Sequence, residues 1–310
     1  MKSVSLISYF VLGILLIIII SGCDIENNND SFRKGNLGLA INPLGGWQNS
    51  EVYEDNSFQI AFKIKNEGVF NISKGIFVVS ADRDLIDYSN NKQIFDLRGR
   101  TKFFNEGEDT IITYDLKTKP LPLHTQMVSD IRSDICYPYN TIFSKDVCIN
   151  SDIYNTYKDK PSLCNKDEMS ISGGQGAPVA VTHVKLKMIP SEGGVIPLVE
   201  FEVRNLGRGL ILNYNTYEDA CSLRDYGFKN YGMINVDKAY LGSDVLECNN
   251  AIITINKEMK KNEYSDSRKA VIKCKGPLMD PSEPYVSNVR LYLKYGYKEH
   301  LKSKIIVVPK

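Results

Sequence analysis

The amino-acid sequence predicts an all-β protein with two antiparallel β-sandwiches in tandem. Its strand candidates alternate apolar and polar residues with the period of two that a half-buried strand shows, and turn residues separate them. Two stretches also occur twice: residues 58–68 (FQIAFKIKNEG) match 197–207 (PLVEFEVRNLG) at a shift of 139, and residues 128–149 match 286–307 at a shift of 158. Because the larger shift comes later in the chain, the second copy carries an insertion of 19 residues.

The first 23 residues have the features of an export segment. Lys2 is the only charged residue before the apolar run at 4–20, and Ser21-Gly22-Cys23 follows. This junction resembles a lipoprotein lipobox, which implies a lipidated Cys23 at the mature N-terminus. An uncleaved membrane anchor is the alternative, although a run of about 17 residues is short for a span. Both interpretations predict attachment to the cell membrane through the N-terminus, with the rest of the chain outside the cytoplasm.

The remainder divides by composition and turn signals. Residues 24–36 are a polar tether, residues 37–150 form the first sandwich, and residues 179–310 form the second. Residues 151–178 are the linker, which ends in a glycine-rich run. This run is not a phosphate-binding loop, because neither Lys-Ser/Thr nor a helix follows it.

The charge balance excludes one class of partner. The chain has 38 Lys and Arg against 37 Asp and Glu, and removal of the export segment with Lys2 makes the two totals equal. No basic field is therefore available to attract nucleic acid.

Strands are expected wherever alternation or a β-branched run is bounded by turn residues. In the first sandwich these are residues 36–43, 58–65, 75–80, 94–97 and 109–117. In the second they are residues 179–189, 197–204, 239–241, 251–255 and 269–275. Residues 213–238 are irregular and rich in tyrosine, so we expect much of the insertion there.

Each sandwich is expected to close with a hairpin, formed by residues 128–149 and by residues 286–307. A tight turn near Ile142 would place Cys136 opposite Cys148, since both are equally distant from it in the sequence. Apart from Cys23 the chain has six cysteines, and an even number in an exported chain favours disulfides. The expected pairs are Cys136–Cys148, Cys221–Cys248 and Cys164–Cys274, and the spacing leaves other pairings open.

Five aromatic residues are candidate contacts for a partner. Tyr137 and Tyr139 lie two residues apart and so on one face of a strand, as do Tyr295 and Tyr297. Packing in the core is one interpretation of these tyrosines. An exposed ladder that binds a protein or a glycan is the other, and Trp47, in a Gly-Gly-Trp turn, is a further candidate contact.

The alternating strand, the Asn-x-Gly turn and the strand after it resemble CARDB-type (cell-adhesion-related) immunoglobulin-like domains of bacterial and archaeal surface proteins. The matching residues are FKIKNEGVFNISKGIFVV at 62–79 and FEVRNLGRGLIL at 201–212. The segments GLAINPLGG, CYPYNT and SGGQGAPVAV also resemble a group of uncharacterised archaeal exported, lipoprotein-like proteins. The resemblance implies two tandem immunoglobulin-like sandwiches of seven strands, and it brings no catalytic residues.

The sequence shows no clear catalytic or metal-binding constellation. His124, His183 and His300 have no neighbouring Ser or Cys in the context of a hydrolase nucleophile. The loop at residues 82–87 (DRDLID) holds three aspartates that could bind calcium, but it lacks the central Gly and terminal Glu of a calcium loop, so we expect a solvated loop. No CxxC motif or Cys-His cluster suggests zinc. We therefore expect no cofactor and no metal.

These observations predict a membrane-anchored protein outside the cytoplasm that binds, adheres or has a structural role in the envelope, without catalytic activity. Two alternatives stay open. One is an accessory subunit of a secretion or pilus-like assembly, and the other is an extracytoplasmic enzyme with its site in residues 213–238. The partner is an unknown protein or glycan.

Overall fold

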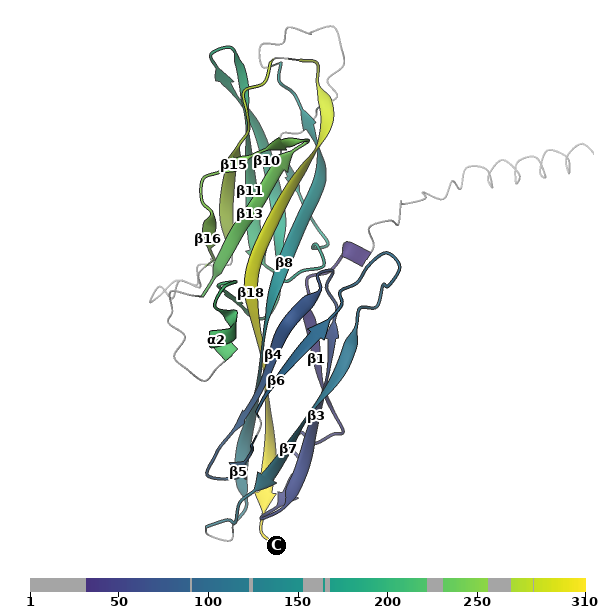
Figure 1. Ribbon diagram of the computed structural model, residues 1–310, viewed down its shortest axis with the longest axis vertical. Coiled ribbons are helices and arrows are strands. Elements are labelled where there is room, and N and C mark those ends of the chain that lie inside the picture. Colours follow the sequence, from purple (N-terminus) through teal and green to yellow (C-terminus); the bar gives the residue numbers. More distant parts are fainter. Residues whose placement is uncertain are drawn as a thin grey trace, which may run out of the picture. The chain divides into compact units, whose positions relative to one another are not determined.

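A computed structural model describes residues 32–89, 91–122, 125–152, 164, 168–221, 231–255, 269–280 and 282–310. The predicted export segment, Cys23 and most of the tether lie outside these residues. Residues 32–310 belong to one compact unit, made mostly of antiparallel strands with one short α-helix in its described part, α2 (Tyr217–Cys221; Figure 1). No described helix is long and apolar enough to cross a bilayer.

The strands of the described residues form three sheets. The four-stranded sheet has the order β1 (Leu39–Leu44), β3 (Ser57–Asn66), β7 (Asp109–Thr118), β5 (Ile86–Asp87). The five-stranded sheet has the order β15 (Glu247–Cys248), β17 (Lys269–Lys275), β11 (Gly194–Asn205), β10 (Val179–Ser191), β9 (Glu168–Ser170).

The third sheet, called the central sheet below, has nine strands. Its main path is β14 (Asp244–Val245), β13 (Met233–Leu241), β18 (Tyr285–Val308), β8 (Met127–Ile149), β4 (Ile72–Ala81), β6 (Lys92–Leu97). Off this path, β2 (Glu51–Tyr53) and β12 (Leu210–Leu212) pair with β18, and β16 (Ile252–Thr254) pairs with β13. Most predicted strands are present, with bounds shifted by a few residues.

The repeated alternating segments become equivalent strands. In β3, Ile60, Phe62 and Ile64 are fully buried, and in β11, Val199, Phe201 and Val203 occupy the same places. Burial of every second residue on one face explains why these two segments carry the strongest period-two signal in the sequence.

The predicted closing hairpins are wrong. Residues 127–149 are one unbroken strand, β8, residues 285–308 are another, β18, and the two strands pair with each other from Tyr285–Ile149 to Val307–Met127. A tight hairpin turn needs residues with positive φ, and none occurs within β8 or β18. The buried positions also stay in phase along β8, so the alternation never requires a turn.

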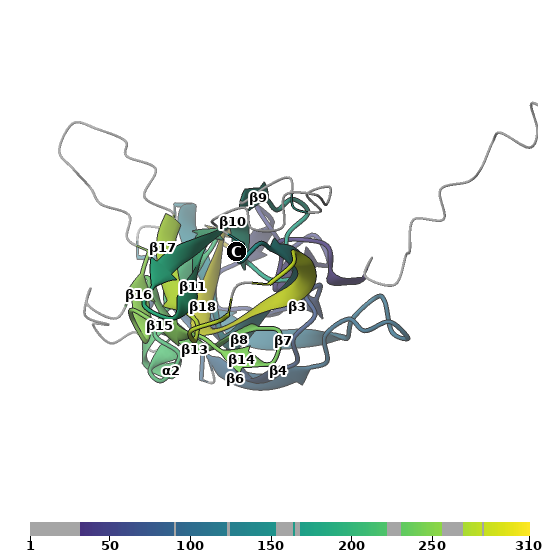
Figure 2. The same ribbon diagram turned by 90° about the horizontal axis from the view of Figure 1, so that it is seen from above.

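The two long strands are shared by two sandwiches. The N-terminal part of β8 pairs with β4, while Phe143 in its C-terminal part packs edge-on against Phe201 of the five-stranded sheet. In β18 the order is reversed: its N-terminal part pairs with β13, and Ile306–Val308 pair with β2 near the start of the chain. In the central sheet β18 and β8 lie side by side, with β13 next to β18 and β4 next to β8 (Figure 2).

Neither predicted segment, 37–150 or 179–310, is therefore self-contained. Each sandwich contains part of the long strand that comes from the other segment. A single apolar core runs through both sandwiches. Below, residues 32–149 are called the first half and residues 168–308 the second half.

Candidate functional site at the junction of the two halves

The four tyrosines lie where the halves meet, and all are fully buried. Tyr137 pairs across the strands with Tyr297, and Tyr139 pairs with Tyr295. The ring centroids of these pairs are 5.8 and 6.2 Å apart. The prediction of an exposed tyrosine ladder is wrong, and the alternative of core packing is confirmed.

Each tyrosine hydroxyl accepts a hydrogen bond from a backbone N–H of its own half. The donors are Leu39 to Tyr137 (3.3 Å), Phe70 to Tyr139 (3.2 Å), Val179 to Tyr295 (3.3 Å) and Gly209 to Tyr297 (2.9 Å). These hydroxyls therefore satisfy buried backbone groups that would otherwise cost stability.

The Asn-x-Gly turns pack against two of these tyrosines. Asn66 donates to the Phe70 carbonyl at 2.8 Å, and its counterpart Asn205 donates to the Gly209 carbonyl at 3.0 Å. A Cβ atom on Gly68 would overlap the Tyr139 hydroxyl. Its counterpart, Gly207, has the same relation to Tyr297. Glycine is thus needed in each turn because a tyrosine hydroxyl occupies the place of a side chain.

One half-buried carboxylate lies beside this tyrosine cluster. The Tyr137 hydroxyl donates to Glu299 Oε1 at 2.6 Å. Burial raises the pKa of Glu299 to about 7, although the hydrogen bonds from Tyr137 and from the Leu39 backbone oppose this rise. Glu299 is therefore a group at the junction whose charge changes near neutral pH.

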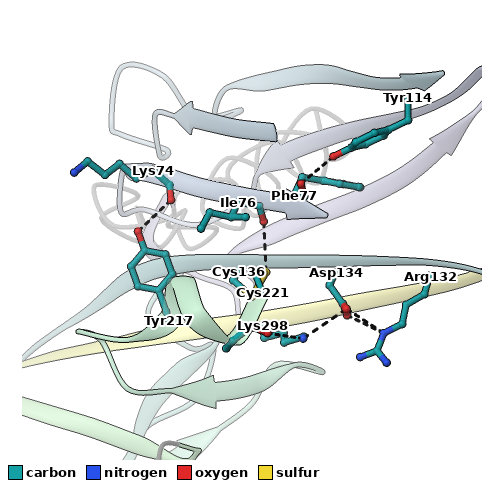
Figure 3. The surroundings of a disulfide bond; sticks show 11 residues. Lys74, Ile76, Phe77, Tyr114, Arg132, Asp134, Cys136, Tyr217, Cys221 and Lys298 are labelled. Carbon is teal, nitrogen blue, oxygen red and sulfur yellow. Dashed lines mark hydrogen bonds and ion pairs between the residues drawn. A yellow bond between two sulfur atoms is a disulfide. The ribbon is translucent and has the colours of Figure 1, made fainter. Parts of the chain in front are cut away.

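The other face of the central sheet carries a small second core, closed by α2 (Figure 3). Cys221 at the end of α2 forms a disulfide with Cys136 of β8. The Tyr217 hydroxyl donates to the Lys74 carbonyl at 3.1 Å. Lys74 has a φ of 56° and lies at a bulge in β4, so α2 of the second half binds an irregular point of the first half.

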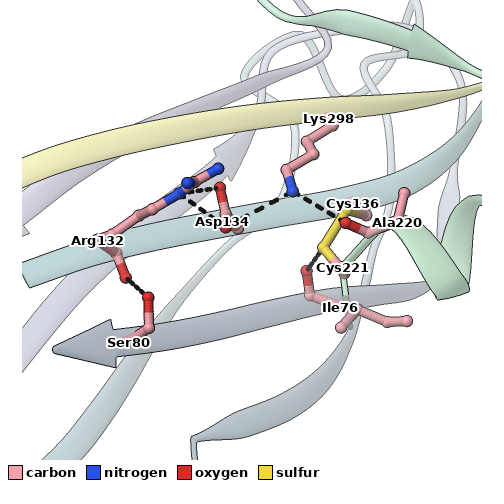
Figure 4. A network of polar contacts seen from close by, with 8 residues as sticks. All are labelled: Ile76, Ser80, Arg132, Asp134, Cys136, Ala220, Cys221 and Lys298. Atoms are coloured by element: carbon pink, nitrogen blue, oxygen red, sulfur yellow. Dashed lines mark hydrogen bonds and ion pairs between the residues drawn. A yellow bond between two sulfur atoms is a disulfide. The ribbon is translucent and has the colours of Figure 1, made fainter. Parts of the chain in front are cut away.

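A polar network next to the disulfide holds the same helix (Figure 4). Lys298 Nζ donates to the Ala220 carbonyl at 2.9 Å and lies 3.6 Å from Asp134 Oδ2. Arg132 Nε lies 3.0 Å from the same oxygen. Burial lowers the pKa of Lys298, and the charge of Asp134 opposes this effect. The network anchors the end of α2 to the centre of the sheet, and we call it the α2 latch.

The helix that the latch holds, α2, lies in the insertion that the repeats predicted. Ile76 pairs with Cys136 and Asn235 pairs with Lys294, and these two pairs are equivalent in the halves. The shift is still 139 at the Asn205 turn and reaches 159 at Asn235, so the extra residues fall between β12 and β13. The prediction that residues 213–238 hold the insertion is confirmed; residues 222–230 within it lie outside the described part.

All three predicted disulfide pairings are wrong. The structure joins Cys136 to Cys221, Cys148 to Cys164 and Cys248 to Cys274. Because β8 does not turn, Cys136 and Cys148 lie about 40 Å apart along one strand. Cys248 and Cys274 face each other on the paired strands β15 and β17, a relation that strand pairing alone decides.

Trp47 is a core residue and not an exposed contact. It is 7% exposed, its ring packs edge-on against Phe62 at 5.4 Å, and its Nε1 donates to the Ala61 carbonyl at 3.2 Å. The prediction of a binding role for Trp47 is therefore wrong. Its indole closes the end of the first sandwich.

The aspartate loop makes contacts within the protein. Asp82 accepts from the Asp84 backbone at 2.9 Å, and Asp87 pairs with Lys119 at 3.1 Å. No group of acidic, His or Cys side chains suited to a metal occurs among the described residues. His183 lies 3.8 Å from Glu168, His300 is exposed, and His124 lies outside the described part.

An exposed aromatic pair, missed by the sequence reasoning, lies in the connection between β6 and β7. Phe103 is 96% exposed and Phe104 is 40% exposed. Backbone hydrogen bonds join Thr101 and Phe104 in both directions, at 2.8 and 3.3 Å, and the Arg98 guanidinium lies 5.6 Å from the Phe104 ring centroid. Two adjacent phenylalanines inside a polar turn were the signal that could have revealed this pair.

No known protein family and no curated protein matches this chain. Among solved structures, the native conformation of E. coli alpha-2-macroglobulin is 9% identical, with a TM-score of 0.26 over 44% of this chain and 8% of that chain. The secreted serine protease VesC from Vibrio cholerae is 12% identical, with a TM-score of 0.19 over 89% and 52%. The C-terminal domain of the Streptococcus pyogenes antigen I/II-family protein AspA is 8% identical, with a TM-score of 0.17 over 87% and 99%.

The chain thus spans 8% and 52% of the lengths of the first two of these structures. At such low TM-scores the similarities support no argument about function.

Proposed function

We propose that this protein acts outside the cytoplasm as a membrane-anchored binding or structural protein of the cell envelope, and not as an enzyme. The observation that carries this proposal is the way in which the two sandwiches are joined into one rigid frame. One ladder between β8 and β18 runs through both sandwiches, and three disulfides link segments that are separated by up to 85 residues in the sequence.

The disulfides support the proposed location. Structural disulfides persist in oxidising compartments and are uncommon in the cytosol. All six cysteines after Cys23 are paired, and one disulfide, Cys136–Cys221, bridges the two halves. A chain exported by its N-terminal segment would form these bonds outside the cytoplasm.

The shared strands support a structural or binding role. Because the halves have a common core and common strands, they cannot hinge freely as two domains on a linker could. Such a frame holds surface loops at fixed positions, which suits recognition or spacing at a cell surface.

We also propose that the halves are distant immunoglobulin-like modules of the CARDB type with exchanged closing strands. The support is the unit of alternating strand, Asn-x-Gly turn and buried tyrosine, which occurs once in each half. A related protein would strengthen this assignment if its halves contained the same unit and its closing strands formed a hairpin within each half.

Fractionation of cells that produce the tagged full chain, followed by mild crosslinking and capture, tests the proposed function. We expect the chain in the membrane fraction, cysteines that react with a thiol reagent only after reduction, and crosslinks to envelope components. Crosslinks to the subunits of a secretion or pilus-like machine would favour the accessory-subunit alternative. Reduced cysteines in a cytosolic chain would overturn the proposal, as would reproducible turnover that is lost on mutation of residues 213–221.

A further inference from the structure

The loop between β6 and β7 presents an apolar side chain on a fixed support. Arg98 N and Nε both donate to Glu108 Oε2, at 2.7 and 3.3 Å, and Arg100 N donates to the Gly68 carbonyl at 2.7 Å. The base of the loop is thus bonded to itself and to the Asn-x-Gly turn of the junction. Phe103 at the tip is nevertheless 96% exposed. Because the backbone of the loop is already held in place, little ordering of the loop is needed when Phe103 meets an apolar environment.

The N-terminal end of the described chain lies beside this loop (Figure 1). The Arg100 guanidinium donates to the Lys34 carbonyl at 2.6 Å. Gly35 N donates to the Gly173 carbonyl at 2.6 Å, and Asn36 Nδ2 donates to the Leu206 carbonyl at 3.4 Å. Residues 34–36 are therefore held in place next to the base of the loop.

The length of chain before this point limits how far the loop can be from a membrane anchor. The apolar run ends at Ile20, and residues 21–31 connect it to Phe32. Eleven residues span at most about 40 Å when fully extended, and less in any other conformation. Phe103 is therefore within reach of a bilayer that holds an N-terminal anchor.

The side chains around Phe103 suit a lipid surface. The basic residues Arg33, Lys34, Arg98, Arg100 and Lys102 lie in or beside the loop, and Glu106 and Glu108 are the acidic residues within it. Glu108 and Arg98 form an ion pair in which one charge of each sign is engaged, and the other charged residues of this group are mostly basic. Aromatic side chains with neighbouring Lys and Arg are typical of the boundary between headgroups and acyl chains, where the ring enters the apolar layer and the cations contact anionic headgroups.

We propose that the β6–β7 loop is a second membrane contact, with Phe103 inserted among the lipids at the surface of an anionic bilayer. This inference depends on the membrane attachment in the proposed function. It adds a direction: the junction of the two halves faces the membrane, and the end of the first sandwich that carries Tyr53 lies away from it.

Tryptophan quenching by brominated lipids tests this contact with the full chain. Trp47 is the single tryptophan and is buried, so the unchanged chain gives the background signal. The variant Phe103→Trp reports on the loop. Tyr53→Trp is a matched control, because Tyr53 is also an exposed aromatic residue (59%) and lies near the opposite end of β3, about 30 Å away.

In vesicles of phosphatidylcholine and phosphatidylglycerol, the emission of Phe103→Trp is expected to shift to shorter wavelength and to be quenched by brominated acyl chains. The unchanged chain and Tyr53→Trp should show neither effect. Equal quenching of Phe103→Trp and Tyr53→Trp would overturn the loop contact while the chain still floats with the vesicles. A chain that does not float with vesicles would overturn both the attachment and the contact. A blue shift of the Phe103→Trp emission in a lipid-free complex with a captured protein, without quenching in vesicles, would replace the lipid by a protein partner.

Discussion

Pro138 on β8 lies directly opposite Gly296 on β18, and the same two residues are equivalent under the repeat of 158 residues. A pair that is both a cross-strand pair and a repeat pair marks a pseudo-two-fold axis. Around it, Tyr137–Tyr297 and Tyr139–Tyr295 exchange places. The ladder therefore has the symmetry of an isologous dimer interface within a single chain.

The disulfide between Cys136 and Cys221 should contribute strongly to stability. It closes a loop of 85 residues. Loss of such a link costs roughly 4 kcal/mol when it acts by chain entropy. We predict this loss in the free energy of unfolding of the double variant Cys136→Ala/Cys221→Ala. Peptide mapping of the unchanged chain without reductant should recover Cys136–Cys221, Cys148–Cys164 and Cys248–Cys274, and recovery of Cys136–Cys148 would contradict the strand exchange.

The glycine of the first Asn-x-Gly turn should be coupled to its tyrosine. Gly68→Ala places a Cβ against the Tyr139 hydroxyl, and such overpacking costs about 1–3 kcal/mol. Tyr139→Phe removes the hydroxyl, so the double variant should be more stable than the sum of the two single changes predicts.

The mismatched combination of Gly68→Ala with Tyr297→Phe is the control, because Tyr297 serves the other turn. Its two effects should add. Denaturant unfolding of the three single and two double variants measures both couplings, and equal coupling in matched and mismatched pairs would rule out the one-to-one relation.

Glu299 should make the protein less stable as the pH rises from 5 to 8. Burial raises its folded-state pKa to about 7 from 4.5. Between these values the unfolded chain has released this proton while the folded chain retains it, so the free energy of unfolding falls with increasing pH and levels off above pH 7. The full effect is at most about 3 kcal/mol.

Urea unfolding at several pH values checks this dependence, with Glu299→Gln as the control. The amide keeps an acceptor for the Tyr137 hydroxyl and does not titrate. The variant should therefore show a flatter profile between pH 5 and 8. A profile parallel to that of the unchanged chain would show that another group causes the dependence.

The α2 latch should open locally when Lys298 is replaced. Lys298→Met removes the donor to the Ala220 carbonyl and leaves Asp134 with Arg132. Loss of a buried hydrogen bond of this kind costs about 1–2 kcal/mol, so amides of α2 should exchange with solvent roughly tenfold faster. Lys294→Met is the control, since its pair with Asp237 is more exposed and contributes little. Equal exchange in both variants would contradict the latch.

The sequence revealed the elements better than their connections. The alternation at Phe62 and Phe201 depends on local burial, so it predicts strands directly. The equivalence of Tyr137 with Tyr295 was also visible, but it does not tell whether a repeated segment folds onto itself or pairs with its copy. Long-range strand pairing decides between these two arrangements. It also explains why Cys136 and Cys148 have other disulfide partners than the sequence predicted.

In the candidate site, too, local features could be predicted from the sequence and long-range contacts could not. The insertion that contains Cys221 could be located from the two unequal shifts, whereas its contact with Lys74 across the junction could not. The exposure of Phe103 also depends on the absence of a covering element in the described fold, and no local pattern encodes it.

The central claim is that the halves exchange their long strands, and the molar mass of an isolated first half tests it most directly. Residues 32–167 with Cys136→Ala retain β8 and the Cys148–Cys164 link but lack β18. All folded material in light scattering should have the mass of a dimer, paired through β8 about Pro138. A stable monomer that unfolds cooperatively would contradict the exchange and would restore two independent sandwiches in tandem.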